Sequence, residues 1–387
     1  MRIAHVITRM IVGGAQENTL LNCEDLVRLH GDEVLLITGP ALGPEGDLLT
    51  QGRGPSFPVA VIPELRRAVH PWRDWISYRK IKRLLADFQP DVVHTHSAKG
   101  GILGRMAATS LGVPAVIHTV HGAPFHPYQR AWARKLIQWA EWYGARKCHL
   151  MVSVADAMTD LMVAGGVAPR EKFVTVYSGM DVAPFVEADR TRDEVRRELG
   201  YRPEHVVIGK IARLFHLKGH DDVVDAARQV VRGCEQARFL FVGDGILRES
   251  LERRIAEAGL TPYFQFTGLV APSRIPSLVG TMDALVHASL REGLARALPQ
   301  ALIAGKPVVS YDCDGAREVV LNGQTGFLLA PRDVDGMANA LVELVSSSEL
   351  RSKLGGQGRE RFTDQFRHET MTRRLRELYV RLLDQRR

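Results

Sequence analysis

The sequence has 387 residues, of which 45% are hydrophobic and 25% are charged, a balance typical of a soluble globular protein. This length predicts two domains with substantial cores rather than one ordinary domain. The four cysteines are scattered without C-x-x-C spacing, which argues against a zinc ribbon and a secreted disulfide framework. The net charge of +7 suits anionic partners, but plain solubility explains it equally well.

The opening segment MRIAHVIT predicts a first β-strand and lacks the basic region, long apolar core and cleavage site of a signal peptide. No run approaches the roughly 18 apolar residues that span a bilayer. We therefore expect a cytoplasmic protein. No RNA-binding or helix-turn-helix motif is evident, so nucleic acid is not an expected partner, and the sequence leaves the oligomeric state open.

The N-terminal half alternates short apolar runs with amphipathic segments, which predicts a doubly wound, mostly parallel sheet. The expected strands are Ile3–Thr8, Glu33–Thr38, Val59–Ile62, Val92–Thr95, Ala115–Val120, Leu150–Val154 and Phe173–Tyr177. The expected helices include Gln16–His30, Trp72–Phe88, Gly101–Leu111 and Ala155–Ala164. After the first strand, Gly13 and Gly14 form a turn that either lets a ligand approach the backbone closely or serves geometry alone.

A polar, charged stretch separates this half from a second alternation of the same kind. Residues 1–184 are predicted to form an N-terminal domain, residues 185–203 a linker with a short helix, and residues 204–367 a C-terminal domain. The expected strands of the latter are Val206–Ile211, Phe239–Val242, Phe264–Phe266, Ala284–His287, Val308–Tyr311 and Gly326–Leu329. The expected helices are Asp221–Arg232, Leu247–Gly259, Arg274–Val279, Ala295–Ala304 and Val334–Ser346. Two α/β domains in tandem suggest a cleft between them.

The most informative stretch is His287–Val320. Pro299 is tolerated only near the first turn of a helix, so a helix is expected to begin around Ala295 or Arg296. Its free backbone N–H groups and positive dipole end would lie beside Glu292, where a phosphate or sugar oxygen could be held.

Glu292 followed by Gln300 resembles the E-x7-E signature of retaining glycosyltransferases of family 4, although Gln300 stands where the family usually has a second Glu. The resemblance covers almost the whole chain and implies the GT-B fold, with two Rossmann-like domains facing a central cleft. It also implies that the apolar stripe of the tail, residues 368–387, belongs to a helix that crosses back to the N-terminal domain.

The resemblance extends to the strand that opens the second domain. Arg213 and Lys218 resemble the family's pair of cations that grip the nucleotide diphosphate, where negative charge collects on the leaving group. The turn with Gly243 and Gly245 resembles the family's V-G-x-G element beside the nucleotide, and Val270 lies in the loop where the backbone commonly meets the base. A dehydrogenase fingerprint fails here because Arg248 stands where its third glycine belongs.

His121 ends a strand of the first domain and resembles the family's His near the reacting sugar. Alternatively, His121 has an ordinary structural role. His94 and His96 share one face of a strand, so a metal pair is geometrically possible, but no third ligand occurs at a recognised spacing and a zinc site is not expected. The D-x-D segment Asp312–Asp314 lies too late in the chain for the metal site of the other glycosyltransferase fold. We therefore expect no required metal and no cofactor.

Two basic, aromatic segments remain. Residues 128–147 are expected to form a helix with Trp132, Leu136, Trp139 and Tyr143 on one face, and residues 72–83 carry Trp72 and Trp75 among several cations. Each either contacts an anionic membrane or packs its apolar face into the core.

The resemblance implies transfer of a sugar from a UDP-, GDP- or ADP-sugar to a sugar or lipid-linked acceptor, with retention at the anomeric carbon. Glu292 would bind the donor sugar, backbone N–H groups of Gly293, Leu294 and Ala295 would support sugar or phosphate oxygens, and Gln300 would face the ribose. A nucleotide-sugar epimerase of the same fold and an inactive, nucleotide-sugar-binding relative are the alternatives.

Overall fold

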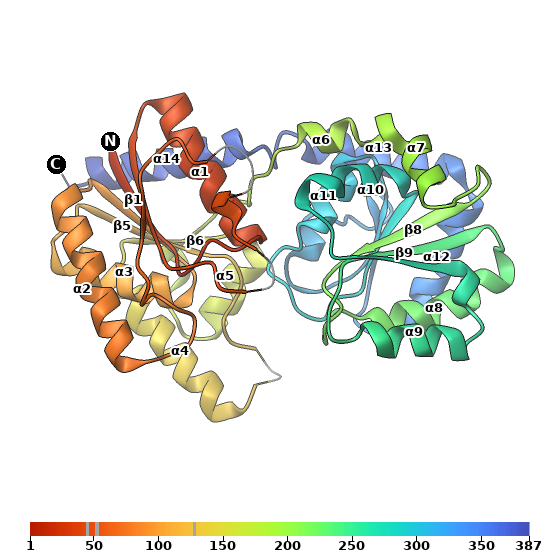
Figure 1. Cartoon of the computed structure of the whole chain (residues 1–387), viewed down its shortest axis with the longest axis horizontal. Coiled ribbons are helices and arrows are strands. Elements are labelled where there is room, and N and C mark those ends of the chain that lie inside the picture. Colours follow the sequence, from red (N-terminus) through yellow and green to blue (C-terminus); the bar gives the residue numbers. More distant parts are fainter. Residues whose placement is uncertain (44–45, 51–53, 127–128, 387) are drawn as a thin grey trace. The chain divides into compact units, whose positions relative to one another are not determined.

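The computed structural model describes residues 1–43, 46–50, 54–126 and 129–386. The chain divides into two compact units, each described here by itself (Figure 1). Unit 1 comprises Met1–Met180 and Phe366–Arg387, and unit 2 comprises Asp181–Gln365. Residues 185–203, the predicted linker, lie within unit 2 in this division. There Arg192 pairs with Asp283 at 2.6 Å, just before a central strand.

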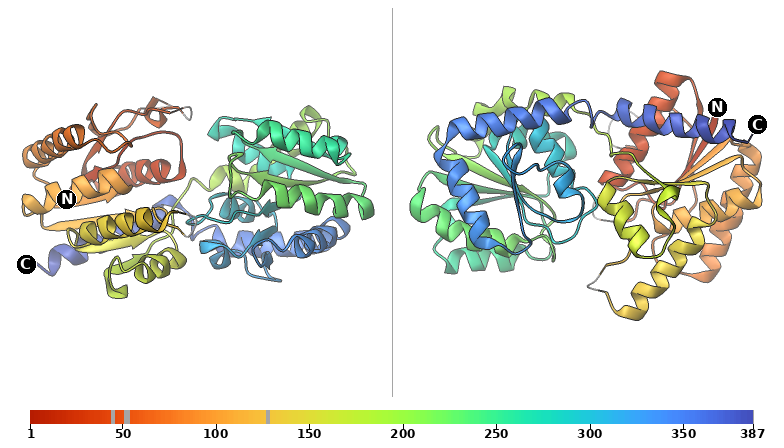
Figure 2. Two further views of the ribbon diagram at one scale, coloured as in Figure 1. Left: turned by 90° about the horizontal axis from the view of Figure 1, so that it is seen from below. Right: turned by 180° about the vertical axis from the view of Figure 1, so that it is seen from behind.

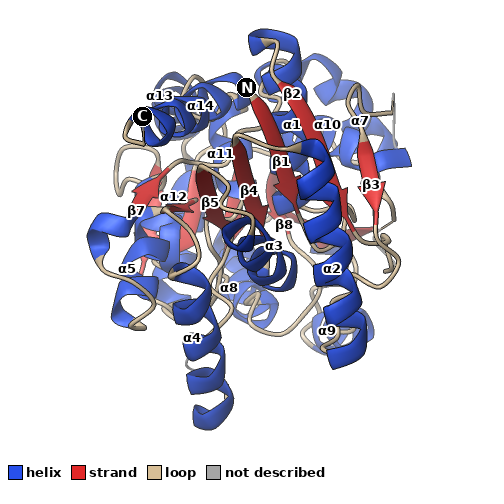
Figure 3. Ribbon diagram, turned by 90° about the vertical axis from the view of Figure 1, so that its left-hand side faces the viewer, coloured by secondary structure: helices blue, strands red, loops and turns tan. Residues whose placement is uncertain are grey.

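Unit 1 is built on a seven-stranded sheet in the order β3-β2-β1-β4-β5-β6-β7, with every described pairing parallel. Figure 3 shows its strands from one side. The strands are β1 (Arg2–Val6), β2 (Glu33–Thr38), β3 (Val59–Val61), β4 (Val92–His96), β5 (Ala115–Val120), β6 (Leu150–Ser153) and β7 (Phe173–Thr175). The central strands β4 and β5 are buried along their whole length, as expected for a parallel sheet covered on both faces.

The helices of unit 1 form layers on the two faces of this sheet (Figure 2). They are α1 (Gly14–His30), α2 (Pro71–Phe88), α3 (Ala98–Ser110), α4 (Ala131–Ala145), α5 (Asp156–Ala164) and α14 (His368–Asp384). Helix α3 packs between α2 and α4 on one face, and α1 packs against α14 on the other. Local signals fix the ends: Pro71 opens α2 after the capping side chain of His70, and Gly31 ends α1 with a left-handed φ of 62°.

The C-terminal helix α14 docks on unit 1, as the resemblance implied. Its buried stripe of Met371, Leu375 and Leu378 joins the core beneath α1. Polar contacts fix its register: Arg376 Nε donates to Asp32 at 2.8 Å, and Tyr379 Oη lies 2.6 Å from a histidine nitrogen of β4.

Unit 2 has a six-stranded parallel sheet in the order β10-β9-β8-β11-β12-β13. Its strands are β8 (Val206–Ile211), β9 (Ala237–Val242), β10 (Phe264–Gly268), β11 (Ala284–His287), β12 (Val308–Tyr311) and β13 (Gly326–Leu329). Its helices are α6 (Ala183–Val186), α7 (Arg192–Glu198), α8 (His220–Gly233), α9 (Arg248–Glu257), α10 (Ile275–Thr281), α11 (Ala297–Ile303), α12 (Val334–Ser346) and α13 (Ser348–Phe362). Helices α10 and α11 cover one face, and α8, α9 and α12 cover the other (Figure 1).

Both sheets reverse their winding direction at one place. In unit 1 the chain moves outward from β1 to β3 and then returns to β4, so β1 and β4 are neighbours at the switch. In unit 2 the same reversal makes β8 and β11 neighbours. Loops at the carboxyl ends of such strand pairs diverge and leave a crevice, which is where open α/β sheets bind ligands. The topology therefore directs attention to the loops after β1, β4, β8 and β11.

Candidate active site

In unit 2 the loops after β8 and β11 are joined by an ion pair. Lys218, just before α8, donates a hydrogen bond to Glu292 Oε1, and both side chains are 20% exposed. The backbone N–H of Leu290 also donates to the carbonyl of Leu217 at 2.8 Å, so the two loops run side by side. The sequence-predicted cation and carboxylate thus meet directly at the switch point of this sheet.

Glu292 is held as a carboxylate. Burial acts to raise its pKa, but the charge and hydrogen bond of Lys218, together with His287 and Ser289, outweigh burial, so the pKa lies below the usual value. His287, at the end of β11, lies 3.6 Å from the same carboxylate oxygen, and burial lowers the pKa of this imidazole to about 3. The pair therefore consists of one cation and one anion beside a neutral ring.

Asp314 supports the loop that carries Glu292, a role that the sequence did not predict. Its Oδ2 accepts the backbone N–H of Glu292 at 2.7 Å, and the N–H of Gly315 donates to the carbonyl of Gly293 at 3.0 Å. In the same segment Asp312 forms a bidentate pair with Arg317 at 2.8 and 2.6 Å. The D-x-D segment thus contributes one carboxylate to the Glu292 loop and one to a surface ion pair.

Two residues of these loops have a strained backbone. Leu217 has a φ of 65° and Asp314 a φ of 50°, a region that side-chain-bearing residues seldom adopt. Gly219 has a φ of 63°, and a Cβ there would lie 1.9 Å from the carbonyl oxygen of Ala288. Such strain persists only where the surroundings impose it, and it is commonly stored at functional sites.

A buried lysine lies on the strand that leads to this site. Lys210 of β8 is 1% exposed, and its Nζ has no hydrogen-bond partner among the described residues. Burial, with a smaller effect of the Lys218 charge, lowers its pKa to about 7. Sequence reasoning missed Lys210 because a single Lys inside an apolar run gives no sign that its amine stays buried.

The glycine turn after β9 packs tightly on the loop after β8. A Cβ on Gly243 would lie 2.3 Å from the carbonyl oxygen of Ala212, and one on Gly245 would lie 2.5 Å from that of Leu214. The N–H of Gly243 donates to the carbonyl of Gly268 at 3.2 Å, which brings the loop containing Val270 to the same edge. The predicted donor-binding elements therefore lie in adjoining loops.

Arg213 begins the loop that ends at Lys218. It is exposed, and its guanidinium lies 5.1 Å from the ring centre of Phe215. The two predicted cations therefore stand at opposite ends of one short loop, with Lys218 fixed by Glu292.

The helix after Glu292 begins later than predicted. Helix α11 starts at Ala297, so Gly293, Leu294 and Ala295 lie in the preceding loop rather than at a helix start, and Gln300 lies in the first turns of α11. Pro299 occupies the third helical position, and this accounts for the late start. Its nitrogen carries no hydrogen, so it cannot donate to the carbonyl of Ala295 as a helix that began there would require.

In unit 1, His121 follows β5 and contacts a group of buried histidines. His96 Nδ1 lies 3.1 Å from His121 Nε2, and His5 Nδ1 of β1 lies 3.0 Å from His96 Nε2. The sequence analysis found no third histidine to join His94 and His96. The structure supplies one from a distant strand, because the parallel register pairs His5 with His94 across the switch point. The absence of a zinc site stays a prediction.

Gly13 and Gly14 lie at the start of α1. Gly13 has a φ of 176°, an extended conformation open to any residue, so its backbone does not require glycine. A Cβ there would meet only the flexible end of Gln16, at 2.8 Å. Turn geometry therefore does not explain the glycine at position 13. The other explanation, that a ligand approaches the backbone there, stays a proposal.

Comparison with known proteins agrees with this arrangement. Residues 191–361 match the family described as Glycosyl transferases group 1, and residues 13–179 match the Glycosyl transferase 4-like domain. The chain is a family 4 glycosyltransferase.

Relatives match this glycosyltransferase over most of its length. It is 27% identical over 383 residues to an Escherichia coli UDP-Gal:alpha-D-GlcNAc-diphosphoundecaprenol alpha-1,3-galactosyltransferase, covering 98% of this chain and 97% of that protein. It is 31% identical to a Streptomyces fradiae 2-deoxystreptamine N-acetyl-D-glucosaminyltransferase over 279 residues, 69% of this chain and 65% of that protein. The crystal structure of Anabaena Alr3699/HepE in complex with UDP superposes with a TM-score of 0.82 at 22% identity, covering 98% and 100% of the two chains. The predicted GT-B fold is confirmed.

The glycosyltransferase exposes an aromatic surface on α2 and α4. Helix α4 projects from the body of unit 1 (Figures 1 and 3), and Trp132 and Trp139 on it are 66% and 59% exposed. On α2, Trp72 is 64% exposed and stacks on Trp75, with ring centres 5.0 Å apart. Packing of these side chains into the core, one of the two interpretations of the sequence, is therefore wrong. Tyr128, at the start of the predicted helix, lies outside the described residues.

A hollow of about 570 Å³ lies between these two helices. Its floor is the start of α3, and its walls include Asp74 of α2 and Ile137 of α4. At the strand ends it is lined by Arg9 and by Lys99, which pairs with Asp74 at 2.7 Å. The hollow therefore combines apolar side chains with charged side chains of both signs.

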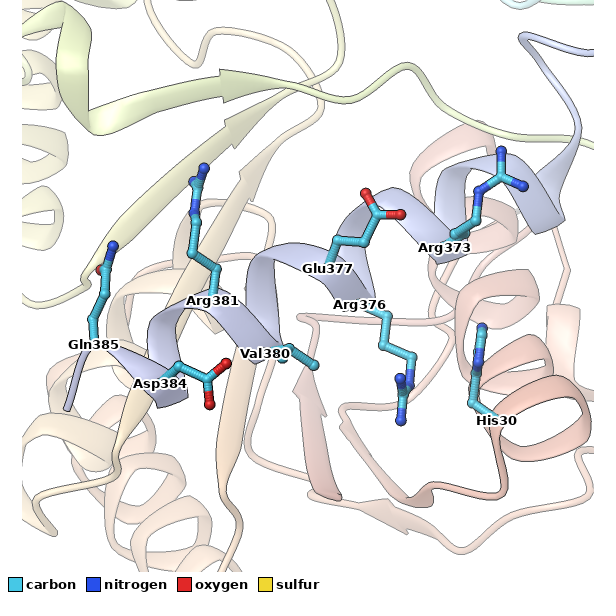
Figure 4. Close-up of a pocket in the computed structure, with 8 residues that line it drawn as sticks. All are labelled: His30, Arg373, Arg376, Glu377, Val380, Arg381, Asp384 and Gln385. Carbon is cyan, nitrogen blue, oxygen red and sulfur yellow. The ribbon is translucent and has the colours of Figure 1, made fainter. Parts of the chain in front are cut away.

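A second hollow of unit 1 lies over α14 (Figure 4). It is lined by charged side chains of both signs, including Arg373, Glu377 and Asp384, and by His30 at the end of α1. Because His30 leads into the start of β2, this hollow lies at the amino ends of the strands, where open α/β sheets seldom bind ligands.

Proposed function

We propose that this glycosyltransferase transfers a sugar from a nucleoside-diphosphate sugar to an acceptor hydroxyl, with retention at the anomeric carbon and without a metal ion. Unit 2 holds the donor, and unit 1 holds the acceptor. The observation that carries the proposal is the contact between Lys218 and Glu292 at the switch point of the unit 2 sheet. UDP and UDP-glucose in the Anabaena structures, and the UDP-Gal and GDP-mannose in the names of relatives, support the donor class.

Each charged group has a role in this reaction. Arg213 and Lys218 stabilise the negative charge that develops on the leaving diphosphate, which replaces the role of a metal ion. Glu292 binds hydroxyl groups of the donor sugar and favours the oxocarbenium-like centre. Among the described residues of unit 2, the two carboxylates of the neighbouring loop are already engaged. Asp314 accepts the Glu292 N–H, and Asp312 pairs with Arg317. We therefore propose a same-face route. The bond between the anomeric carbon and the diphosphate breaks, the acceptor oxygen bonds to that carbon on the same face, and the acceptor proton passes to a diphosphate oxygen.

Incubation with UDP-, GDP-, ADP- and dTDP-sugars tests the proposal. A donor that stabilises the protein against heat is then supplied with candidate acceptors, and NMR of the product gives its anomeric configuration. We expect transfer with retention that survives EDTA. Isomerisation of the donor without any acceptor would favour the epimerase, and donor binding without turnover would favour the inactive relative.

Gln300 distinguishes the active enzyme from the inactive relative. An amide can accept one hydrogen bond and donate another, so it can still bind a ribose hydroxyl. We expect Gln300→Glu to change the donor Kd by less than about tenfold, the effect of roughly one hydrogen bond, and to leave kcat measurable. Activity that appears only in Gln300→Glu would show that the natural chain is the inactive relative.

The acceptor that best suits unit 1 is a lipid-linked sugar at a membrane surface. Relatives act on a diphosphoundecaprenol-linked sugar and on a phosphatidylinositol mannoside, by their names. Helices α2 and α4 carry exposed tryptophans, and the hollow between these helices has Arg9, Arg67 and Lys99 in its lining. Amphipathic aromatic rings and cations are the groups that bind anionic lipid surfaces. None of the described helices is long and apolar enough to span a bilayer.

A further inference from the structure

The histidines of unit 1 form a chain of ring-to-ring contacts that leads from the buried strand β1 to His121. His5 lies on β1, His96 ends β4, and His121 follows β5. The planes of the His5 and His96 rings lie within 14° of each other with centres 5.3 Å apart, and the centres of His96 and His121 are also 5.3 Å apart. Their facing nitrogens lie 3.0 and 3.1 Å apart, which is the distance of a hydrogen bond.

Two of these rings are neutral. His5 and His96 are 0% and 1% exposed. Burial lowers the pKa of His5 to about 3 and that of His96 well below 6.5. A neutral imidazole donates one hydrogen bond and accepts one, so a chain of such rings must run in a single direction.

The inner end of the chain sets that direction. His5 Nε2 is buried and has no hydrogen-bond partner among the described residues. If it carried the proton, a buried N–H would be left without an acceptor, which is rare and costly. If the proton is on Nδ1, His5 donates to His96, and only a lone pair is left unused. His96 Nδ1 then donates to His121 Nε2.

We propose that His5 and His96 are positioning residues that fix His121 as the tautomer with its proton on Nδ1. This inference rests on the proposed function and on the family resemblance, which implies that His121 lies near the reacting sugar. Because Nε2 of His121 accepts from His96, His121 acts there as a hydrogen-bond donor through Nδ1 and not as the base that removes the acceptor proton. That role agrees with a reaction in which a diphosphate oxygen takes the proton.

A metal ion held by His5, His94 and His96 is the competing interpretation, since their ligand atoms lie within 4.8 Å of one another. His94, however, already uses both nitrogens. Its Nδ1 lies 2.6 Å from Tyr379 Oη, and its Nε2 lies 2.6 Å from Thr119 Oγ1. A metal would have to displace one of these bonds and also separate His5 from His96, so the hydrogen-bonded chain fits the contacts better.

The test reads the tautomer directly. In protein labelled with ¹⁵N-histidine, NMR distinguishes protonated from unprotonated ring nitrogens, and loss of one signal set in His121→Asn assigns His121. We expect Nδ1 of His121 to be protonated in the natural protein and in His5→Asn, whose amide can still donate to His96. His5→Phe keeps an aromatic ring but cannot donate, so His121 should become a mixture of tautomers. His94→Phe, which removes contacts outside the chain, should leave His121 unchanged.

Kinetics provide a second readout. We expect His5→Phe to lower kcat about tenfold, the effect of roughly one hydrogen bond, with the donor KM unchanged and with His5→Asn restoring most of the rate. The inference is overturned if His121 is protonated on Nε2, if His5→Phe leaves its tautomer unchanged, or if the purified protein holds one zinc ion per chain. The NMR result stands without turnover, so loss of the proposed function and loss of this inference are distinguishable.

Discussion

Lys218 and Glu292, 74 positions apart in the sequence, form a hydrogen-bonded ion pair that closes the switch point of the unit 2 sheet. Each is only partly exposed, and each comes from a loop whose backbone is held by its neighbour. The pair therefore presents a cation and an anion at fixed positions before any donor binds. Such preorganisation is what makes charged groups effective in stabilising a transition state.

Removing either partner should therefore cost far more activity than stability. We expect Lys218→Ala and Glu292→Gln each to lower kcat/KM by about 100-fold or more, the typical effect of losing one electrostatic group of this kind. Steady-state kinetics with the best donor measure this. Lys353→Ala, which removes an exposed lysine of α13, serves as the control and should leave kcat/KM unchanged. Unchanged turnover in both site variants would refute the catalytic assignment.

Asp314 should be a positioning residue for Glu292. Its carboxylate accepts the Glu292 N–H at 2.7 Å, and its φ of 50° is one that Asn also tolerates. We expect Asp314→Ala to lower kcat about tenfold, corresponding to roughly one hydrogen bond, whereas Asp314→Asn keeps an acceptor oxygen and most of the activity. Equal losses in the two variants would point to a different role. Thermal unfolding of both checks that the fold is retained.

The sequence predicted most of the fold because its signals are local. Alternating buried strands and amphipathic helices gave the two α/β domains, and several strands, such as Val206–Ile211 and Val308–Tyr311, have the predicted bounds. Glu292 and Lys218 could be found because each follows a strand and together they match a family motif. Helix α13 escaped prediction because its apolar residues are too few to form a clear stripe.

What escaped prediction depends on contacts between distant residues. His5 joins His96 only through the β1–β4 pairing, and no spacing in the sequence indicates that register. The support of Glu292 by Asp314 depends on how two loops meet. Exposure is likewise not a local property, so the tryptophans of α4 could be assigned to a surface only from the structure.

The exposed aromatic surface predicts binding to membranes. We expect the protein to sediment with vesicles that contain anionic lipid at low salt, and the bound fraction to fall as salt is added, because screening weakens the attraction of its cations. Trp132→Ser combined with Trp139→Ser should reduce binding at least several-fold, since two large exposed side chains are lost.

A matched change elsewhere on unit 1 controls for exposed apolar area. Leu29 on α1 is 46% exposed and lies away from α2 and α4, so Leu29→Ser should sediment like the natural protein. Absence of binding at low salt, or equal loss in Leu29→Ser, would exclude this surface as a membrane contact.

Lys210 predicts a specific dependence of stability on pH. Its pKa is lowered to about 7 in the folded protein, whereas in the unfolded chain it has the ordinary value of 10.5. Between these values the unfolded chain binds more protons, so this residue makes the free energy of unfolding rise with pH from about 7 to 10.5. Below pH 7 the folded protein carries a buried charge, and its full cost is present.

Lys210→Met removes this cost while it keeps the length of the side chain. We expect the variant to be more stable than the natural protein at pH 6 by on the order of a few kcal/mol, and the difference to shrink steadily as pH rises from 7 to 9.5. Urea unfolding at each pH measures it. His220 and His287 nearby have pKa values lowered from 6.5 to about 3, so both stay neutral in the fold above pH 6. Their titration in the unfolded chain is common to the natural protein and the variant, so it cancels in the difference. Lys353→Met, at an exposed position, should show no such trend. A difference that is constant or grows with pH would mean that Lys210 keeps its charge in the fold, because a lysine that is paired or solvated gains no stability from losing its proton.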